Sequence, residues 1–105
     1  MEKFKLIYKI LHFIDAAASN DQFDIEAFCE KRFDVSRNDF LNAIEMLLDA
    51  GYVKGVELGW STDWRAALSV TWPKLTLDGL KFLATDEIML KEAKNAKGFN
   101  VKSLT

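Results

Sequence analysis

The sequence predicts an α+β winged helix-turn-helix domain with about five helices and a two- or three-stranded β-hairpin wing. Three segments with helical spacing of apolar residues come first, and short polar turns join them. Two segments with alternating apolar residues follow, as in a half-buried hairpin. Helical spacing then returns in the segment from Leu75 to Phe82-Leu83. Helices, then a hairpin, then further helices is the element order of a small winged-helix domain.

The first expected helix covers residues 3–17. Its apolar side chains recur every three or four positions, so that one face of the helix is buried; they include Phe4, Ile7, Leu11 and Ile14. Lysines lie off this face and interrupt the apolar run, and no small-residue cleavage site follows. We therefore expect a helix of the fold and not a signal peptide.

Capping signals predict the next two helices. Asp24 is a candidate N-cap for a helix over about residues 25–32. Ser36 is the candidate N-cap of the third helix, and Asp39 occupies the N3 position beside the positive end of the helix. Gly51 should end the third helix, because glycine enters the left-handed C′ conformation without steric cost.

The hairpin is predicted by apolar residues at every second position: Val56, Leu58 and Trp60 on one strand, and Leu68, Val70 and Trp72 on the other. Residues 61–63 form the expected turn, and Gly55 indicates a bulge. Trp72 lies on the apolar phase, so we expect its side chain in the core. Pro73 should end the second strand, because proline has no N–H to donate to the ladder.

Two further helices are predicted after the hairpin. Thr76 is the expected N-cap of a helix over about residues 77–84. Either Thr85 or Asp86 should cap a last helix that runs to about Lys97.

Length and composition predict one domain. The chain has 105 residues, of which 50% are hydrophobic, enough for a single core. We expect that domain over residues 1–98 and a loose tail over 99–105. No apolar run approaches the ~18 residues that cross a bilayer, so no membrane is expected. The only cysteine, Cys29, cannot form an internal disulfide, so we expect a cytoplasmic protein.

The charge pattern of the third helix bears on nucleic-acid binding. Proteins that bind phosphates are usually basic, whereas the net charge here is −2. In a DNA-reading winged helix the third helix enters the major groove. Arg37, Asn38 and Asn42 have suitable donors and acceptors for base edges. The acidic residues of this helix outnumber Arg37, and no lysine is present to hold phosphates; they are Asp39, Glu45 and Asp49.

Two short motifs carry a family resemblance. Gly51-Tyr52-x-x-Gly55-Val56, followed by Pro73-x-Leu75-Thr76-x-x-Gly79-Leu80-x-Phe82-Leu83, is similar to the YjcQ-like family. That family comprises small winged-helix proteins of Firmicutes and their phages, and the resemblance covers about residues 5–97. It implies a winged-helix fold of bacterial or phage origin, but no catalytic or binding residues, since the family has none agreed. The hairpin segment 60–67 is longer and more aromatic than the family pattern.

No constellation of residues in the sequence predicts catalysis. His12 is the only histidine, so a metal site or base would lack a second histidine. Cys29 follows Phe28 and precedes Glu30, and an acidic neighbour does not activate a thiol. No phosphate-binding glycine loop, catalytic triad or paired-cysteine zinc pattern is present. We expect no enzyme, no metal and no cofactor.

Two classes of function remain open from the sequence. The first is a DNA-binding regulator, in which Arg37, Asn38, Asn42 and Arg65 would contact duplex DNA. The second is a protein-interaction module with Trp60 and Trp64 as anchors on the hairpin wing, because tryptophan is enriched where interfaces concentrate binding energy. A homodimer through the last helix, over residues 86–97, is a further expectation.

Overall fold

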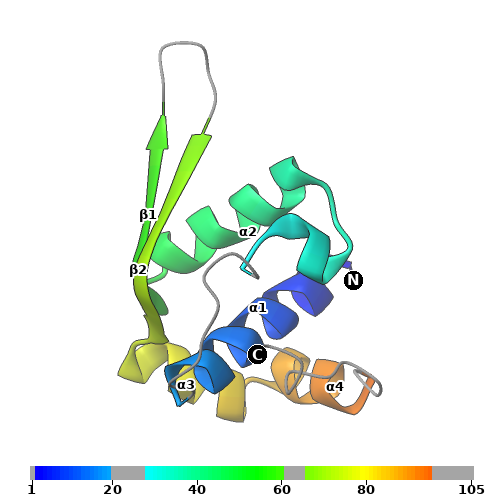
Figure 1. Cartoon of the computed structure of the whole chain (residues 1–105). Coiled ribbons are helices and arrows are strands. Elements are labelled where there is room, and N and C mark those ends of the chain that lie inside the picture. The colour runs from blue at the N-terminus through cyan, green and yellow to red at the C-terminus, as the bar shows by residue number, and fades with distance from the viewer. Residues whose placement is uncertain (1, 20–27, 61–65, 96–105) are drawn as a thin grey trace.

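Four α-helices and a two-stranded antiparallel hairpin make up the part of the chain that the computed structural model describes, which is residues 2–19, 28–60 and 66–95 (Figure 1). The elements in chain order are α1 (Glu2–Ala18), the 3-10 turn η2 (Glu30–Phe33), α2 (Arg37–Asp49), β1 (Val53–Trp60), β2 (Ala66–Leu75), α3 (Leu77–Thr85) and α4 (Glu87–Asn95). The predicted α+β class is confirmed.

Helix α1 lies at the centre of the fold, as its apolar spacing predicts. It contacts α2, α3, α4 and β2. Four of its side chains are fully buried, and they are Ile10, Leu11, Phe13 and Ile14. A helix that is apolar over so much of its circumference is stable only when other elements cover it on several sides.

A cluster of four phenylalanine rings, hereafter the aromatic cluster, packs beside α1 and consists of Phe13, Phe28, Phe33 and Phe40. Ring centroids lie 5.3 Å apart for Phe28 and Phe40, and 5.6 Å apart for Phe33 and Phe40. These separations are typical of favourable aromatic pairs. The cluster joins α1 to α2 through the η2 segment.

The helix predicted over residues 25–32 is wrong in its described part. Phe28 and Cys29 lie in a bend, and a 3-10 turn follows. Phe28 and Phe33 both point into the aromatic cluster. On an α-helix, residues five apart point about 140° away from one another, so a continuous helix could not bury both rings in one place. The described residues therefore hold four α-helices where the sequence predicts about five.

The predicted helix caps Ser36 and Thr76 are confirmed, and the Asp86 carboxylate caps α4, which begins at Glu87. The backbone N–H of Asp39 donates to the Ser36 hydroxyl over 3.1 Å, that of Gly79 to the Thr76 hydroxyl over 3.1 Å, and that of Met89 to the Asp86 carboxylate over 3.1 Å. Each bond satisfies an N–H that the helix itself leaves unpaired. Gly51 follows α2 with a φ of 74°, as expected for a glycine at a helix end.

A bulge interrupts the hairpin at Gly55, as predicted. Lys54 pairs with Lys74 and Val56 pairs with Val70, so Gly55 alone faces three residues of β2. Its φ of 78° is in the left-handed region. A Cβ atom at this position would overlap the carbonyl oxygen of Trp72. Both the backbone angle and the close approach therefore require glycine.

The predictions for Trp72 and Pro73 are wrong, and the bulge explains both. Trp72 is 60% exposed and not in the core. Pro73 does not end β2, which continues to Leu75. Before the bulge the partly buried positions include Leu68 and Val70, and after it Pro73 is buried. The inward phase changes at the bulge on both strands, between Val70 and Pro73 on β2 and between Val53 and Val56 on β1. The ladder is interrupted where proline has no N–H to offer.

Several predicted features fall outside the described residues. They are Asp24, the turn at 61–63, Trp64, Arg65, Lys97 and the tail at 99–105. Within the described helices, none combines the length and the apolar character that a membrane crossing requires.

Candidate interaction surfaces

The exposed face of α2 presents the first set of candidate residues. Arg37, Asn38 and Asn42 are all exposed on α2, but Arg37 and Asn42 are five positions apart and therefore point about 140° away from one another. Asn38 and Asn42 share one helical stripe with Glu45 and Asp49, because residues 3 to 4 positions apart lie on the same side of a helix. Any duplex that reached the asparagines would therefore also meet two carboxylates.

The one arginine of this face already has an acidic neighbour. Nη1 of Arg37 lies 3.5 Å from Oε2 of Glu30, which comes from η2. The Arg37 side chain remains 53% exposed, so this pair contributes little to stability. It does lower the positive potential that a DNA phosphate would meet at the start of α2. The exposed face of α2 is thus acidic in balance.

The hairpin extends beyond the helices in Figure 1, and Trp60 is the last residue of β1. The backbone of Trp60 pairs with Ala66 near the far end of the hairpin. The side chain of Trp60, and the whole of Trp64 and Arg65, lie outside the described part of the chain. The predicted tryptophan wing therefore remains a prediction, and the structure supplies only the position of Trp60 along the strand.

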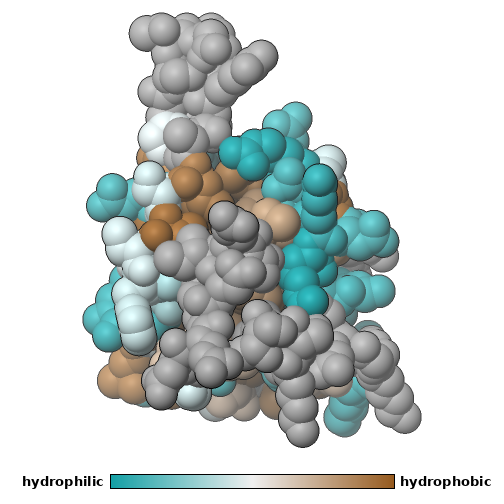
Figure 2. Space-filling view, viewed as in Figure 1, coloured by the Kyte–Doolittle hydropathy of each residue, from teal (hydrophilic) through white to brown (hydrophobic). Residues whose placement is uncertain are grey.

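A second exposed surface lies where the hairpin meets α3, and the sequence analysis missed it. This surface, hereafter the hairpin–α3 corner, consists of Trp72, Leu77 and Leu80. Trp72 is 60% exposed and Leu77 is 68% exposed. Figure 2 shows hydrophobic residues gathered at the foot of the hairpin, over α3. The available signal was the pair Gly55 and Pro73, since a bulge there reverses the side on which Trp72 projects.

Backbone contacts hold the hairpin–α3 corner in place. The hydroxyl of Thr76 donates to the carbonyl of Gly51 over 2.5 Å, and its backbone N–H donates to the carbonyl of Tyr52 over 3.0 Å. A Cβ atom on Gly79 would overlap that same Tyr52 carbonyl, so the backbone of α3 packs directly against the backbone of Tyr52. The Tyr52 and Phe82 rings stack with centroids 4.7 Å apart. The exposed side chains of the corner are therefore not needed to fix its shape.

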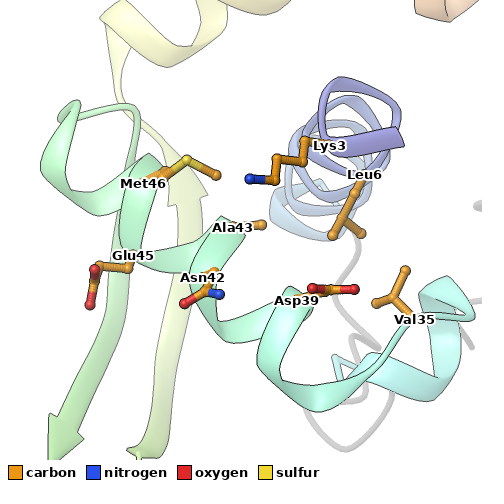
Figure 3. A pocket seen from close by; sticks show the side chains of 8 residues that line it. All are labelled: Lys3, Leu6, Val35, Asp39, Asn42, Ala43, Glu45 and Met46. Atoms are coloured by element: carbon orange, nitrogen blue, oxygen red, sulfur yellow. The ribbon is translucent and has the colours of Figure 1, made fainter. Parts of the chain in front are cut away.

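A groove between α1 and α2, hereafter the α1–α2 groove, forms the third surface. Its volume is about 640 Å³, and its lining residues are Lys3, Leu6, Val35, Asp39, Asn42, Ala43, Glu45 and Met46. In Figure 3 the Lys3 side chain extends from α1 towards Met46 of α2. A smaller hollow of about 130 Å³ continues past Leu6 and Val35 and is lined also by Lys5, Lys9 and Asp34.

The α1–α2 groove could have been anticipated from Ala43. This small residue stands in the inward stripe of α2, between the much larger Phe40 and Leu47. A short side chain on a helix face leaves a gap against the neighbouring helix unless a larger side chain fills it from the other side. The spacing of apolar residues identifies Ala43 only as a core position and does not say which helix it faces.

His12 and Cys29, the two side chains considered for catalysis or metal binding in the sequence, both lie within the described residues. Nδ1 of His12 lies 3.0 Å from the hydroxyl of Tyr8, one helical turn earlier. Burial raises the pKa of the Tyr8 hydroxyl. Cys29 is a half-buried free thiol. Among the described residues, no group of three or more histidine, cysteine or acidic side chains is placed to hold a metal ion.

The fold defines the class of this protein as a small mixed α+β domain with a projecting β-hairpin. A family model described as YjcQ protein matches residues 8–102, nearly the whole chain, and the chain belongs to the YjcQ family. No curated protein and no solved structure matches it. The family resemblance drawn from the glycine and threonine motifs is thereby confirmed.

Proposed function

We propose that this chain is a protein-interaction module that binds its partner through the hairpin–α3 corner. The exposure of Trp72 carries this proposal, since this indole is 60% exposed and Leu77, five residues later at the start of α3, is 68% exposed. Exposed apolar patches on small domains usually mark contact sites. Tryptophan is also among the residues that most often dominate binding energy at interfaces.

The order of elements supports a winged helix-turn-helix plan for this module. Helix α2 precedes the hairpin directly, as the third helix of that plan precedes its wing. The second helix of that plan would fall between α1 and α2, where the described residues form the 3-10 turn η2. In this proposal the winged-helix plan serves protein contact, and the wing and α3 present the binding side chains.

The electrostatics of α2 favour protein over DNA as the partner. A protein that relies on phosphate contacts needs lysines and arginines on the face that meets the backbone. Here that face carries Asp39, Glu45 and Asp49, and Arg37 is paired with Glu30. Coulomb repulsion from these carboxylates would oppose the approach of a duplex.

Site-specific photocrosslinking tests the protein-interaction proposal. A photoreactive amino acid in place of Trp72 should capture a defined partner, whereas the same group in place of Ile88, a 43% exposed residue of α4, should not. The purified partner should then bind the Trp72→Ser variant at least about tenfold more weakly, the loss typical of a central interface residue. Equal binding by wild type, Trp72→Ser and the control Ile88→Ser would refute the role of the corner. A Trp60→Ser variant tests the predicted tryptophan wing in the same assay.

DNA binding is the second candidate, and the exposed positions of Arg37, Asn38 and Asn42 at the start of α2 favour it. Fluorescence anisotropy with labelled duplex DNA over a salt series tests it. Phosphate contacts would produce binding that weakens steeply with salt, and Arg37→Ala should reduce it. Absence of binding at low salt would exclude this function.

A further inference from the structure

The two walls of the α1–α2 groove carry opposite charge. Lys3 stands on the α1 wall, and Lys5 stands on α1 in the adjoining hollow. Asp39 and Glu45 stand on the α2 wall. No ion pair joins Lys3, Asp39 or Glu45 to another side chain within the described ranges. Each wall therefore keeps charge that a binding partner could neutralise.

The floor of the groove is apolar. Leu6 of α1, Ala43 of α2 and Val35 before α2 line it. Met46 stands at the edge of the groove and is 44% exposed. A flexible thioether side chain of this kind fills irregular apolar gaps well. The groove thus has an apolar floor and, at its edge, an exposed Met46 side chain that is able to fill an apolar hollow of the same kind.

We propose that the α1–α2 groove is the contact face of a symmetric homodimer, in which the basic wall of each copy lies against the acidic wall of the other. In a two-fold dimer the same surface of both copies must be complementary to itself. A two-fold axis that lies in the contact plane and runs along the groove places α1 of one copy opposite α2 of the other. Lys3 of each copy then faces Glu45 of its partner.

The charges on the two walls favour a two-fold axis along the groove and a second copy of the chain as the molecule bound there. A two-fold axis across the groove would place lysines against lysines, and carboxylates against carboxylates, which is unfavourable. A nucleic acid or a uniformly acidic peptide would be attracted by one wall and repelled by the other. A second copy presents both signs in the required order, together with the Met46 side chain for the apolar floor.

The dimer should be weak and sensitive to salt. Eight residues line the groove, whereas a standard interface involves about 20–30 residues on each side, so we expect the affinity of a transient complex. Its charged walls are exposed to solvent, and salt screens such pairs. This contact is separate from the hairpin–α3 corner, so the dimer and the proposed partner binding can succeed or fail independently.

Charge reversal with mixing tests the proposal, using sedimentation equilibrium of the full chain over a concentration series at low salt. The wild type should dimerise, and Lys3→Glu or Glu45→Lys should each weaken the dimer at least about tenfold, because like charges then face each other. An equimolar mixture of the two variants should dimerise again, since Lys3→Glu on one chain faces Glu45→Lys on the other and the second contact remains native. The double variant should also self-associate.

Three controls make the outcomes decisive. Circular dichroism should show that each variant is folded, which is expected because both positions are exposed. Glu57→Lys, an exposed charge reversal on the hairpin, should leave the dimer unchanged. Leu90→Ser on α4 tests dimerisation through the last helix. A monomer at every concentration, single reversals without effect, a mixture that stays monomeric, or a dimer lost only in Leu90→Ser would each overturn the proposal.

Discussion

Four phenylalanine rings pack against one another beside α1, whereas at the hairpin–α3 corner Trp72 and Leu77 lie mostly in water. The two regions differ in what holds them. In the aromatic cluster the side chains are buried, and their packing fixes the path of the chain between α1 and α2. At the corner, backbone features fix the path, namely the bulge at Gly55, the Thr76 cap and the close approach at Gly79.

This difference teaches how a small domain can keep large apolar side chains available for binding. A side chain that is needed for the core cannot also contact a partner. Where glycine and a capping threonine fix the backbone, the adjacent tryptophan and leucines contribute little to folding and stay exposed. The comparison can be tested by substitutions that separate packing from backbone geometry.

The largest effect should come from Phe40→Ala. The Phe40 side chain is fully buried, stacks on Phe33 and meets the Phe28 ring edge-on. Removing a buried aromatic ring costs about 3–5 kcal/mol of unfolding free energy, from lost transfer energy and the cavity that remains. Urea denaturation followed by circular dichroism measures this loss. The matched control is Trp72→Ala, which should change stability by no more than about 0.5 kcal/mol, as is usual at the surface.

A large loss of stability in Trp72→Ala would break the comparison. It would mean that the indole supports the hairpin and is not free to bind. A small loss in Phe40→Ala would contradict it from the other side, since the aromatic cluster would then be able to repack around the missing ring.

The next largest effect should come from Gly55→Ala, where backbone geometry holds the corner. Alanine would have to adopt a φ of 78° and would overlap the Trp72 carbonyl. We expect a loss of about 2–4 kcal/mol, of which the left-handed backbone contributes about 1–2 kcal/mol. Gly51→Ala is the matched control, because Gly51 has a φ of 74° and a Cβ atom there would meet no other atom within 4 Å. Thermal unfolding should rank Gly55→Ala as the less stable variant, and equal effects would refute the close contact.

A smaller effect should follow from Thr76→Ala. The Thr76 hydroxyl accepts from Gly79 and donates to Gly51, so it both caps α3 and ties it to the end of α2. Loss of both bonds should cost about 1–2 kcal/mol. Ser36→Ala removes only a cap at the exposed start of α2 and should cost less, and Thr76→Ser should retain most of the stability. Chemical denaturation of the three variants gives the order, and a Ser36→Ala effect larger than that of Thr76→Ala would contradict it.

Much of this fold could be predicted because its helix ends depend on local chemistry. Ser36 and Thr76 cap the helices they are expected to cap, and Gly51 and Gly55 adopt positive φ values. Such features act within a few residues, so the sequence displays them directly.

The remaining features depend on contacts between distant segments. The change of inward phase at the bulge decides whether Trp72 points inward, and the alternating pattern alone does not show where that phase changes. The bend at Phe28 forms because that ring packs on Phe13 and Phe40, residues from two different helices. The α1–α2 groove likewise arises only when Lys3 and Glu45 are brought to opposite walls of one hollow.

The smallest effect tests a polar contact inside the packed region. Tyr8→Phe keeps the ring but removes the hydroxyl that lies 3.0 Å from Nδ1 of His12. Loss of one such hydrogen bond should cost about 0.5–1.5 kcal/mol at neutral pH.

Burial raises the pKa of Tyr8 above its ordinary value of 10.0. Above pH 10.0 the unfolded chain therefore loses the tyrosine proton before the folded chain does, and the wild type loses stability as the pH rises through the folded pKa. Tyr8→Phe has no proton to lose at this position, so the stability gap between the two proteins should narrow from about pH 9 to about pH 11. Urea unfolding across that range measures the gap, and a gap that widens with pH would show that the folded state favours the ionised phenol.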